Sequence, residues 1–492
     1  MPDLTLSGAN FILGQPSHLG SDRVAPHRGS GPATYTATSH EIEAAAKAAE
    51  EAFGPYAAKT AEERAAFLDK IAEEIEGLGD GLLELTRVET ALPLARLTGE
   101  RGRTTGQLRM FASLLRAGLW NKPTIEEADP LRTPLPKPGL YRTLVPLGPV
   151  AVFGASNFPY AFSVAGGDTA SALAAGCPVI VKAHPSHPGT SELVAGAINR
   201  AATATGMPSG VFAMLNGGPS VGKELVLRPE IYAVGFTGSQ KAGRALYDLG
   251  ASRPRPIPVY AEMGSVNPVF LFAGALAERG EKIAEGYAAS LTMGVGQFCT
   301  NPGVVVGPAG SDFDAFIASV SSKLAAAAEG TMLDEGIRAR YLEGVAHLAS
   351  EAETCSKGEG VKPALFVVSA AEFLANPSLR EEVFGPAAVA VRCEGRFDEV
   401  ARVLEGQLTA TVHFADSDTE SVRSLLPSLV RGAGRIVANG FPTGVEVNAA
   451  QQHGGPYPAT TDSRSTSVGT AAIERFVRPV ALQDFPAGLL PG

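Results

Sequence analysis

One cysteine stands in surroundings suited to nucleophilic chemistry. Cys299 lies in Gly-Gln-Phe-Cys-Thr, residues 296–300, a glycine-flanked turn that follows an apolar segment rich in small residues. The other cysteines, Cys177, Cys355 and Cys393, have no comparable neighbours, and the chain has no CxxC pair or Cys/His spacing. This usage argues against a disulfide framework or a zinc site and for a reducing compartment. A single cysteine is more often a small buried hydrophobe, so the assignment of Cys299 depends on other residues.

Two polar residues follow apolar runs that predict strands. Asn157 stands in Gly-Ala-Ser-Asn-Phe-Pro, residues 154–159, where its amide can donate a hydrogen bond to an oxyanion; a structural turn is the alternative. Glu262 ends the run Pro-Val-Tyr-Ala-Glu, where burial would raise its pKa and suit it to act as a base near neutral pH. A solvated glutamate at a strand end is the alternative there.

A glycine-containing turn, Phe-Thr-Gly-Ser-Gln-Lys-Ala-Gly at residues 236–243, leads from a predicted strand into a predicted helix. Helix amino termini present unpaired N–H groups and a positive dipole end, which suit a pyrophosphate. The spacing matches neither the usual dinucleotide fingerprint nor a P-loop. Alone, this turn is weak evidence for phosphate binding.

These residues stand in a pattern of alternating strands and helices. Apolar runs at 150–153, 179–182, 211–215, 233–236 and 257–262 alternate with helical segments at about 161–175, 189–205, 219–227 and 240–251. The alternation predicts an α/β protein with an open parallel sheet, whose ligands bind at the carboxyl ends of the strands. A second unit with the same pattern is predicted after Val266. Its strands are expected near 267–272, 303–307, 387–392 and 409–414, and its helices near 281–293, 311–328 and 336–350.

Helices precede the first sheet, and a proline-interrupted segment follows them. Residues 38–118 are helical by pattern, with capping boxes that begin at Thr38 and Thr60. Prolines interrupt residues 122–149, and the β-type run 140–145 predicts an arm that leaves the main body. Such an arm commonly serves subunit contact.

Composition bounds the class of protein. A chain of 492 residues predicts two or three domains, and its net charge of −10 gives no general attraction to nucleic acid or to an anionic membrane. The amino-terminal residues lack a signal-peptide pattern, and no apolar stretch of about 18 residues occurs. We therefore expect a cytoplasmic protein without nucleic-acid or membrane partners.

Six motifs carry a resemblance to a known family. They are Asn157-Phe158-Pro159, Lys182, Phe236-Thr-Gly-Ser239, Glu262-Met-Gly264, Gly296-Gln-x-Cys299-Thr and Glu382-Val-Phe-Gly-Pro386. In this order and spacing the chain resembles the aldehyde dehydrogenase superfamily over nearly its whole length. The resemblance implies a dinucleotide-binding domain at residues 1–122 and 148–264, a catalytic domain at 265–466, and a small β oligomerisation arm at 123–147 and 467–492. A homodimer or homotetramer is expected on the same ground.

The resemblance also implies residue roles. Cys299 is expected to attack the aldehyde, Asn157 and the Cys299 backbone N–H to hold the oxyanion, and Glu262 to activate the water that hydrolyses the thioester. A thioester divides aldehyde oxidation into hydride loss and hydrolysis. The cofactor is expected to contact Ser156, Lys182, Gly238, Ser239, Glu382 and Phe384. The expected substrate contacts are Arg103, Gln107 and Phe158, and no metal is expected.

The residues after Lys182 bear on the choice of cofactor. NAD-preferring relatives commonly read Lys-Pro-Ser-Glu, whose glutamate binds the adenosine ribose, whereas this chain reads Lys182-Ala-His-Pro185. A 2′-phosphate would meet no carboxylate there, so NADP is predicted as the preferred cofactor, with NAD use possible. His184 and His187 are separated by proline and are expected to be turn or surface residues rather than metal ligands.

Further motifs resemble one branch of the superfamily, the α-ketoglutaric semialdehyde (2,5-dioxovalerate) dehydrogenases, which also includes NADP-linked enzymes of long-chain aldehydes. They include Lys182-Ala-His-Pro-Ser-His-Pro, Cys299-Thr-Asn-Pro-Gly303 and His453-Gly-Gly-Pro-Tyr-Pro. The predicted reaction is 2,5-dioxovalerate to 2-oxoglutarate. On the arginine-rich helix 99–116, Arg103 is the expected partner of the substrate carboxylate, and Gln107 shares its face. Arginines on a helix are often only solvated, and an apolar tunnel would instead indicate a long-chain aldehyde.

Three other functions are weighed against this one. A coenzyme A-acylating aldehyde dehydrogenase would share the thiol, but Glu262 favours water as acceptor. A cysteine hydrolase would need a histidine base, and no histidine lies near Cys299 in sequence. A structural homologue without activity is expected to have lost Cys299, Asn157 and Glu262, all of which are present.

Overall fold

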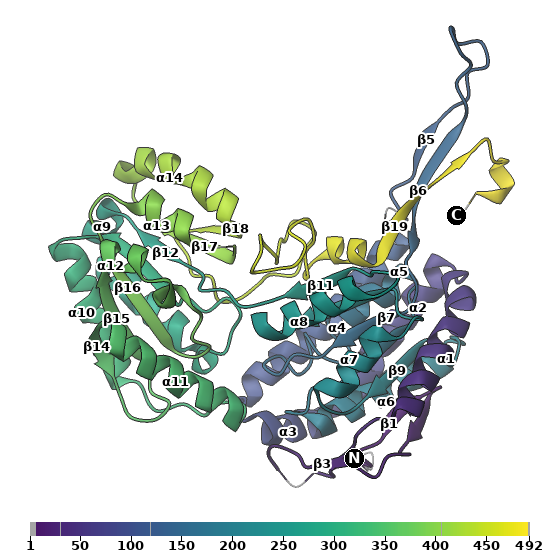
Figure 1. The fold of residues 1–492 in the computed structure, drawn as a ribbon, viewed down its shortest axis with the longest axis horizontal. Coiled ribbons are helices and arrows are strands. Elements are labelled where there is room, and N and C mark those ends of the chain that lie inside the picture. The colour runs from purple at the N-terminus through teal and green to yellow at the C-terminus, as the bar shows by residue number, and fades with distance from the viewer. Residues whose placement is uncertain (1–5, 30, 119, 405, 491–492) are drawn as a thin grey trace.

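The computed structural model describes residues 6–29, 31–118, 120–404 and 406–490. It consists of two α/β units side by side and a slender arm that projects from one of them (Figure 1). Residues 1–5, which belong to the predicted dinucleotide-binding range and to the signal-peptide argument, lie outside the described residues. Residues 491–492 of the predicted arm lie outside them as well.

The helical amino-terminal part begins with two small strand pairings and then four helices. The helices are α1 (Ser39–Ala57), α2 (Ala61–Gly77), α3 (Gly79–Thr90) and α4 (Leu94–Arg116), and a two-stranded sheet of β3 (Arg23–Val24) and β4 (Thr34–Tyr35) precedes them. Both predicted capping boxes are present, since Thr38 pairs reciprocally with Glu41, and Thr60 with Glu63. The paired backbone and side-chain bonds satisfy N–H groups that the helix itself leaves open.

The first sheet has seven strands in the order β11-β10-β7-β8-β9-β1-β2. Strands β7 to β11 are parallel, and β1 and β2 add an antiparallel edge. The strands are β1 (Asn10–Ile12), β2 (Gln15–Ser17), β7 (Val150–Phe153), β8 (Val179–Lys182), β9 (Phe212–Leu215), β10 (Ala233–Thr237) and β11 (Val259–Glu262). The crossover helices are α5 (Gly167–Ala175), α6 (Pro188–Ala204), α7 (Pro219–Leu227) and α8 (Gln240–Ser252).

The second sheet also has seven strands, in the order β14-β15-β16-β13-β12-β17-β18, and only β14 is antiparallel. Its strands are β12 (Val269–Leu271), β13 (Val304–Pro308), β14 (Glu353–Lys357), β15 (Ala364–Ser369), β16 (Ala387–Cys393), β17 (Gln407–His413) and β18 (Ala433–Ala438). Its helices are α9 (Ala273–Thr292), α10 (Ser311–Ala326), α11 (Glu335–Glu351), α12 (Ala370–Ala375), α13 (Phe397–Val403) and α14 (Thr419–Gly432). Short 3₁₀ turns are η1 (Met293–Gly296), η2 (Pro377–Arg380) and η3 (Asp416–Asp418).

A three-stranded antiparallel sheet forms the arm. It consists of β5 (Thr124–Glu126), β6 (Leu140–Pro146) and β19 (Val477–Gln483). The 3₁₀ turns η4 (Thr470–Phe476) and η5 (Ala487–Leu489) flank β19 in the sequence. The arm therefore joins two segments that lie far apart in the sequence. Figure 1 shows it leaving the body near α5.

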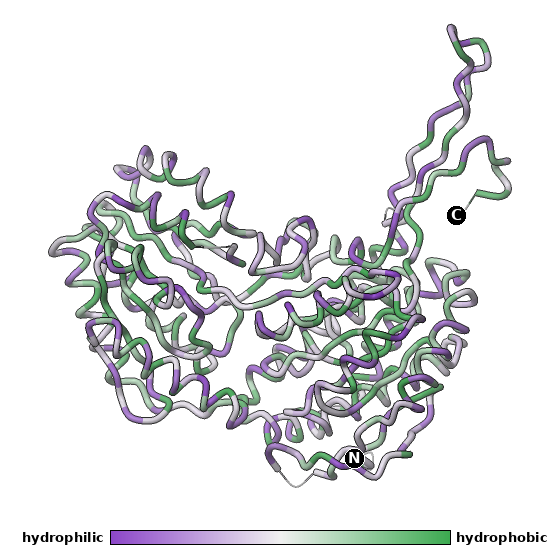
Figure 2. Tube along the Cα trace, in the orientation of Figure 1, coloured by the Kyte–Doolittle hydropathy of each residue, from purple (hydrophilic) through white to green (hydrophobic). Residues whose placement is uncertain are grey.

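The fold class predicted from the sequence is confirmed, but some elements differ. The helix expected from residue 161 begins at Gly167, because residues 158–166 form turns at the end of β7. The edge strands β2, β14 and β18 were not predicted, nor were β1 and β15. Hydrophobic segments follow the strands through the body (Figure 2), and the buried aliphatic residues of both sheets form the core.

Candidate active site

The backbone before Cys299 adopts an unusual conformation that fixes the thiol. Gly294, Val295 and Gly296 all have positive φ, between +56° and +63°. A Cβ on Gly296 would lie 2.3 Å from the carbonyl carbon of Gly385, so only glycine fits there. Backbone conformations with positive φ at consecutive residues persist only where the surrounding structure enforces them. The turn predicted around Cys299 is therefore rigidly seated against the neighbouring loop.

Buried hydrogen bonds hold the loop on both sides of the cysteine. The Asn267 amide donates to the carbonyl of Cys299 at 2.8 Å and to that of Asn301 at 2.9 Å. The side-chain oxygen of Gln297 accepts from the backbone N–H of Leu333 at 3.0 Å. Asn267 was not predicted as a site residue, since its partners become visible only in the folded chain.

Asn157 is tied to the same loop. The side-chain amide of Asn157 donates to the backbone carbonyl of Gln297 at 3.0 Å. The backbone carbonyl of Asn157 accepts a hydrogen bond from Nη2 of Arg96 at 2.6 Å. The Arg96 guanidinium lies over the rings of Phe158 and Phe298, at 5.1 and 4.7 Å from their centroids. Since an amide has two N–H groups, Asn157 retains one for another acceptor. Arg96 thus positions Asn157 and is a second residue that the sequence did not indicate.

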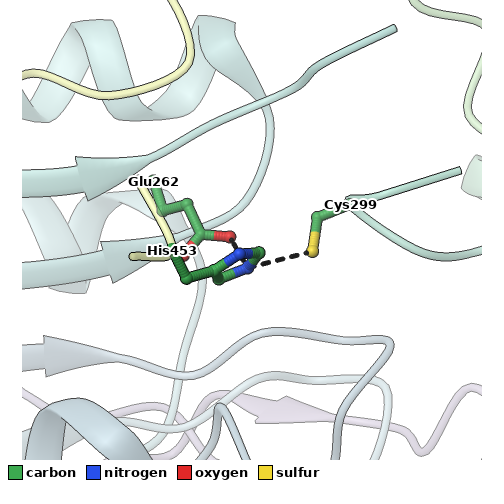
Figure 3. Close-up of side chains that lie close together, drawn as sticks. All are labelled: Glu262, Cys299 and His453. Carbon is green, nitrogen blue, oxygen red and sulfur yellow. Dashed lines mark hydrogen bonds and ion pairs between the residues drawn. The ribbon is translucent and has the colours of Figure 1, made fainter. Parts of the chain in front are cut away.

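His453 joins Cys299 to Glu262 (Figure 3). Its Nε2 lies 3.5 Å from Sγ of Cys299 and 2.9 Å from Oε1 of Glu262, and both His453 and Glu262 are buried. The Ser467 hydroxyl donates a short hydrogen bond to Oε2 of Glu262, and Oε1 faces Nε2 of His453. The same nitrogen, Nε2, therefore faces both the thiol and the carboxylate. Without a proton it can accept the thiol proton, and once protonated it can donate to Glu262.

The environment shifts the pKa values of this group in opposite directions. Burial and the Glu262 carboxylate raise the pKa of the Cys299 thiol well above its usual value, with Arg103 opposing them. The free thiol therefore depends on a base rather than on a lowered pKa. Burial also acts to raise the pKa of Glu262, but His453, Ser467 and Arg475 outweigh it and hold that pKa below its ordinary value. The expectation of a raised Glu262 pKa was wrong, because sequence does not reveal these neighbours.

A cavity of about 320 Å³ opens onto the thiol between the two units. Residues from the first sheet, the Cys299 loop and α11 line it. Of the predicted site residues, the cavity brings together Ser156, Asn157, Phe158, Gly238, Ser239, Cys299, Glu382 and Phe384. Lys182, Glu262, Arg103 and Gln107 are not among its lining residues. The carboxyl ends of β7 and β10 therefore face the cysteine of the second unit. This agrees with the prediction that ligands bind at the carboxyl ends of the parallel strands.

The cavity wall has the donors and acceptors that a dinucleotide requires. Ser239 caps α8, whose amino terminus faces the cavity, and Gly238 donates its N–H to the carbonyl of Glu262 at 3.0 Å. Glu382 is so close to Gly264 that a Cβ there would lie 2.0 Å from its Oε2. Burial lowers the pKa of Lys182 to about 8 and raises that of Glu382 to about 7. These residues fit a nicotinamide dinucleotide.

Arg103 and Gln107 lie on α4, as the sequence indicated. Arg103 sits over the Phe162 ring at 5.4 Å from its centroid, and its buried Nε and Nη2 make no hydrogen bond. It acts electrostatically on Cys299. Gln107 is buried beside Gly167 at the start of α5. Buried guanidinium nitrogens without a hydrogen-bond partner are well suited to receive an anion.

Histidines are where sequence reasoning fell short. His453 follows Cys299 by 154 residues, and no spacing rule links the two. His187, expected in a turn or on the surface, is fully buried, with Nε2 2.9 Å from the carbonyl oxygen of Ala155. It supports the bend that carries Asn157. Among the residues the structure describes, no helix is long and apolar enough to cross a membrane.

The fold and the cysteine-bearing cavity are those of a thiol-dependent dehydrogenase, and the chain belongs to the aldehyde dehydrogenase family, whose model matches residues 21–455. It is 52% identical to alpha-ketoglutaric semialdehyde dehydrogenase 2 of Azospirillum brasilense, over 99% of this chain and 95% of the relative. It is 47% identical to the alpha-ketoglutaric semialdehyde dehydrogenase of Acinetobacter baylyi, with the same coverage. The predicted family is confirmed.

Solved structures agree on the fold. The aldehyde dehydrogenase KauB from Pseudomonas aeruginosa matches with a TM-score of 0.83 at 22% identity, over 98% of this chain and 97% of that one. Aldehyde dehydrogenase C of Pseudomonas syringae, solved with NAD⁺ and octanal, matches with a TM-score of 0.81 at 21% identity, over 98% of each chain.

Proposed function

We propose that the enzyme oxidises an aldehyde to a carboxylate through a thiohemiacetal and then a thioester on Cys299. The observation that carries the proposal is the line of three groups in which His453 lies 3.5 Å from the thiol and 2.9 Å from Glu262. Family membership supplies the reaction class. The residue roles rest on this geometry and on the motifs.

The first step needs a thiolate and a place for negative charge. His453 takes the thiol proton, and Glu262 stabilises the imidazolium that results, because its carboxylate is ionised at neutral pH. Sulfur then forms a bond to the aldehyde carbon. The remaining N–H of Asn157 and the backbone N–H of Cys299 hold the oxygen as it becomes negative.

The second step is hydrolysis of the thioester. Glu262, assisted by His453, accepts a proton from the attacking water, and the imidazole returns a proton to the departing sulfur. Ser467 holds the other carboxylate oxygen and so fixes its direction. The same pair therefore serves both steps, and water rather than coenzyme A is the acceptor.

We further propose that residues 1–122 and 148–264 form the dinucleotide-binding domain and that residues 265–466 supply the thiol. A nicotinamide held there would supply the hydride acceptor for the oxidation. Ser156, Gly238, Ser239, Glu382 and Phe384 line the cavity that would hold the cofactor. Glu382 would accept hydrogen bonds from ribose hydroxyls, and Lys182, at the end of β8, would meet the adenosine phosphate. We infer a preference for NADP, since Pro185 stands where a competing carboxylate would be. Asp334 also lines the cavity, but Ser186 and Ile337 engage it.

Cofactor affinity is expected to depend on pH through Glu382 and Lys182. Below pH about 7 the Glu382 carboxyl is protonated and loses its capacity to accept two ribose hydroxyls; above pH about 8 Lys182 loses its charge. The KM for the cofactor is therefore expected to be lowest between about pH 7 and 8. Steady-state assays from pH 6 to about 9 measure it. In Glu382→Gln the rise on the acid side is expected to vanish, and its persistence would contradict the assignment.

The proposed substrate is 2,5-dioxovalerate, which yields 2-oxoglutarate. Both relatives named above carry α-ketoglutaric semialdehyde in their names. Arg103 supports this choice, because its buried Nε and Nη2 have no hydrogen-bond partner while a carboxylate would satisfy both. Phe162, below the guanidinium, holds it in place.

Removal of the Arg103 charge is expected to separate acidic from apolar aldehydes. In Arg103→Leu, kcat/KM for 2,5-dioxovalerate should fall by roughly 10- to 100-fold, the scale of a charge-assisted hydrogen bond, while hexanal oxidation persists. Arg109→Leu is the matched control, since Arg109 lies on the same helix and pairs with Glu76 at the surface. Steady-state kinetics with both aldehydes decide. If neither substrate responds, Arg103 does not bind the carboxylate.

A second candidate function is oxidation of long-chain aldehydes. The rings of Phe158, Phe162 and Phe298 pack edge to face within 5.5 Å near the thiol and offer an apolar wall. Two results together would favour this alternative. The wild-type enzyme would have little activity with 2,5-dioxovalerate, and the Arg103→Leu enzyme would prefer long-chain aldehydes.

The arm is proposed to mediate a homodimer or homotetramer. It exposes Ile125, Leu131, Leu135 and Leu140 to solvent in the single chain, and isolated monomers rarely expose such a cluster. The cytoplasmic location stays a prediction from the amino-terminal sequence and the cysteine usage.

A further inference from the structure

The three side chains around the thiol are of the kinds that bind zinc and related soft metal ions. One sulfur, one imidazole nitrogen and one carboxylate oxygen come from Cys299, His453 and Glu262, and no two of these atoms are more than 4.8 Å apart. Thiolate, imidazole and carboxylate are the ligands that Zn²⁺ takes in proteins. The sequence predicted no metal, because the three residues lie far apart along the chain.

Two of the three ligand–ligand distances are close to those around a tetrahedral ion. With bond lengths of about 2.3 Å to sulfur and about 2.1 Å to nitrogen and oxygen, neighbouring ligands lie about 3.4 to 3.6 Å apart. Sγ of Cys299 and Nε2 of His453 are 3.5 Å apart. Nε2 and Oε1 of Glu262, at 2.9 Å, would need to open by only about half an ångström.

The cluster also contains a buried carboxylate. The side chains of Glu262 and His453 are only 2% and 1% exposed, and Oε1 of Glu262 lies 2.9 Å from Nε2 of His453. When Nε2 carries no proton, two lone pairs face each other across this contact, and a cation between them would satisfy both. Access is available, since Cys299 lines the cavity, and an ion that enters there meets the sulfur first.

We propose that Cys299, His453 and Glu262 form a reversible inhibitory site for Zn²⁺ or Cd²⁺. Binding replaces the thiol proton with a metal–sulfur bond and releases one proton, with no change of oxidation state. Three protein ligands leave one position for water. While the ion is bound, the sulfur lone pair is engaged and cannot attack an aldehyde. The proposal rests on ligand geometry and is independent of which aldehyde the enzyme oxidises.

Reversibility follows from the surroundings of the histidine. A histidine that holds a resident metal usually donates its other ring N–H to a carboxylate or carbonyl, which orients the ring. Nδ1 of His453 is buried and makes no hydrogen bond. The site is therefore expected to bind the ion less tightly than a structural zinc site and to release it to a chelator.

The test measures metal binding to the cofactor-free enzyme. Equilibrium dialysis measures the binding of Zn²⁺, and absorption spectroscopy measures the binding of Co²⁺. We expect one ion per chain, a sulfur-to-cobalt charge-transfer band, slower alkylation of Cys299 by iodoacetamide, and recovery of activity with EDTA. Glu262→Gln and His453→Gln should each weaken binding by at least ~10-fold, the lower end of the loss seen when support of a metal ligand is removed.

Cys299→Ser should abolish the charge-transfer band, whereas Cys355→Ser, on β14, should leave it unchanged. Retained cofactor binding in each variant shows that the variant is folded. The proposal is overturned if His453→Gln and Glu262→Gln bind Zn²⁺ as tightly as wild type, or if bound Zn²⁺ leaves alkylation of Cys299 unaffected. Loss of aldehyde oxidation alone does not count, since it would test the proposed function instead.

Discussion

Replacing Cys299 with alanine is expected to reduce aldehyde oxidation by about 10⁴-fold or more, because removal of the covalent nucleophile leaves only binding and orientation. Sγ is the atom placed 3.5 Å from the imidazole base, and it lines the cavity that receives the substrate. The measurement is formation of reduced nicotinamide with 2,5-dioxovalerate and with hexanal. The rates with both aldehydes should fall by a similar factor, because the sulfur attacks the carbonyl carbon that the two substrates share.

Cofactor binding should survive this substitution. The residues proposed to hold the dinucleotide, such as Ser239 and Glu382, do not depend on the sulfur. A dissociation constant close to that of wild type shows that the variant is folded. Cys355→Ala, on β14, is the matched control and should keep full activity. Activity of Cys299→Ala within ten-fold of wild type would show that another residue is the nucleophile.

Replacing Glu262 with glutamine is expected to separate the two halves of the reaction. Without an ionised carboxylate the thioester has no effective base, so steady turnover should fall by roughly 10²- to 10⁴-fold, the contribution of a general base. An initial burst of reduced cofactor, close to one per active site, should remain. Glutamine keeps the size of the side chain and an acceptor for Ser467, so packing is preserved.

Rapid mixing followed by absorbance of the reduced nicotinamide measures burst and steady phases in one trace. A steady rate equal to that of wild type would remove Glu262 from the hydrolysis step. A loss of burst and steady phase together would instead place Glu262, with His453, chiefly in activation of the thiol.

Some elements with clear boundaries were predicted closely from the sequence. Strands β7 and β8 are apolar runs and have the predicted bounds, and so has helix α7, which begins at Pro219 after two glycines. The buried apolar strand β15 was missed all the same. The edge strand β14 reads Glu-Thr-Cys-Ser-Lys and has no apolar run to detect. An edge strand pairs on one side only, so its sequence is weakly constrained.

The site shows the same division. Cys299, Asn157 and Glu262 were indicated by local motifs. The fold places Asn157 in the cavity that Cys299 lines and Glu262 beside His453, which lies 3.5 Å from the thiol. His453 was quoted only as part of a motif, because its contact with Cys299 depends on a loop that returns from the far end of the chain. The direction of the Glu262 pKa shift was predicted wrongly for the same reason. The apolar strand sequence predicts burial, but the partners whose effect on the pKa exceeds that of burial are brought together only by the tertiary structure.

The central claim is a covalent thioester on Cys299, and the most direct test is to trap it. Glu262→Gln is mixed with NADP and 2,5-dioxovalerate, quenched in acid within the burst, digested and analysed by mass spectrometry. We expect the peptide that contains Cys299 to carry one acyl group, sensitive to hydroxylamine, and only when the cofactor is present. An unmodified Cys299 peptide after a full burst, or an acyl group on another residue, would contradict the account.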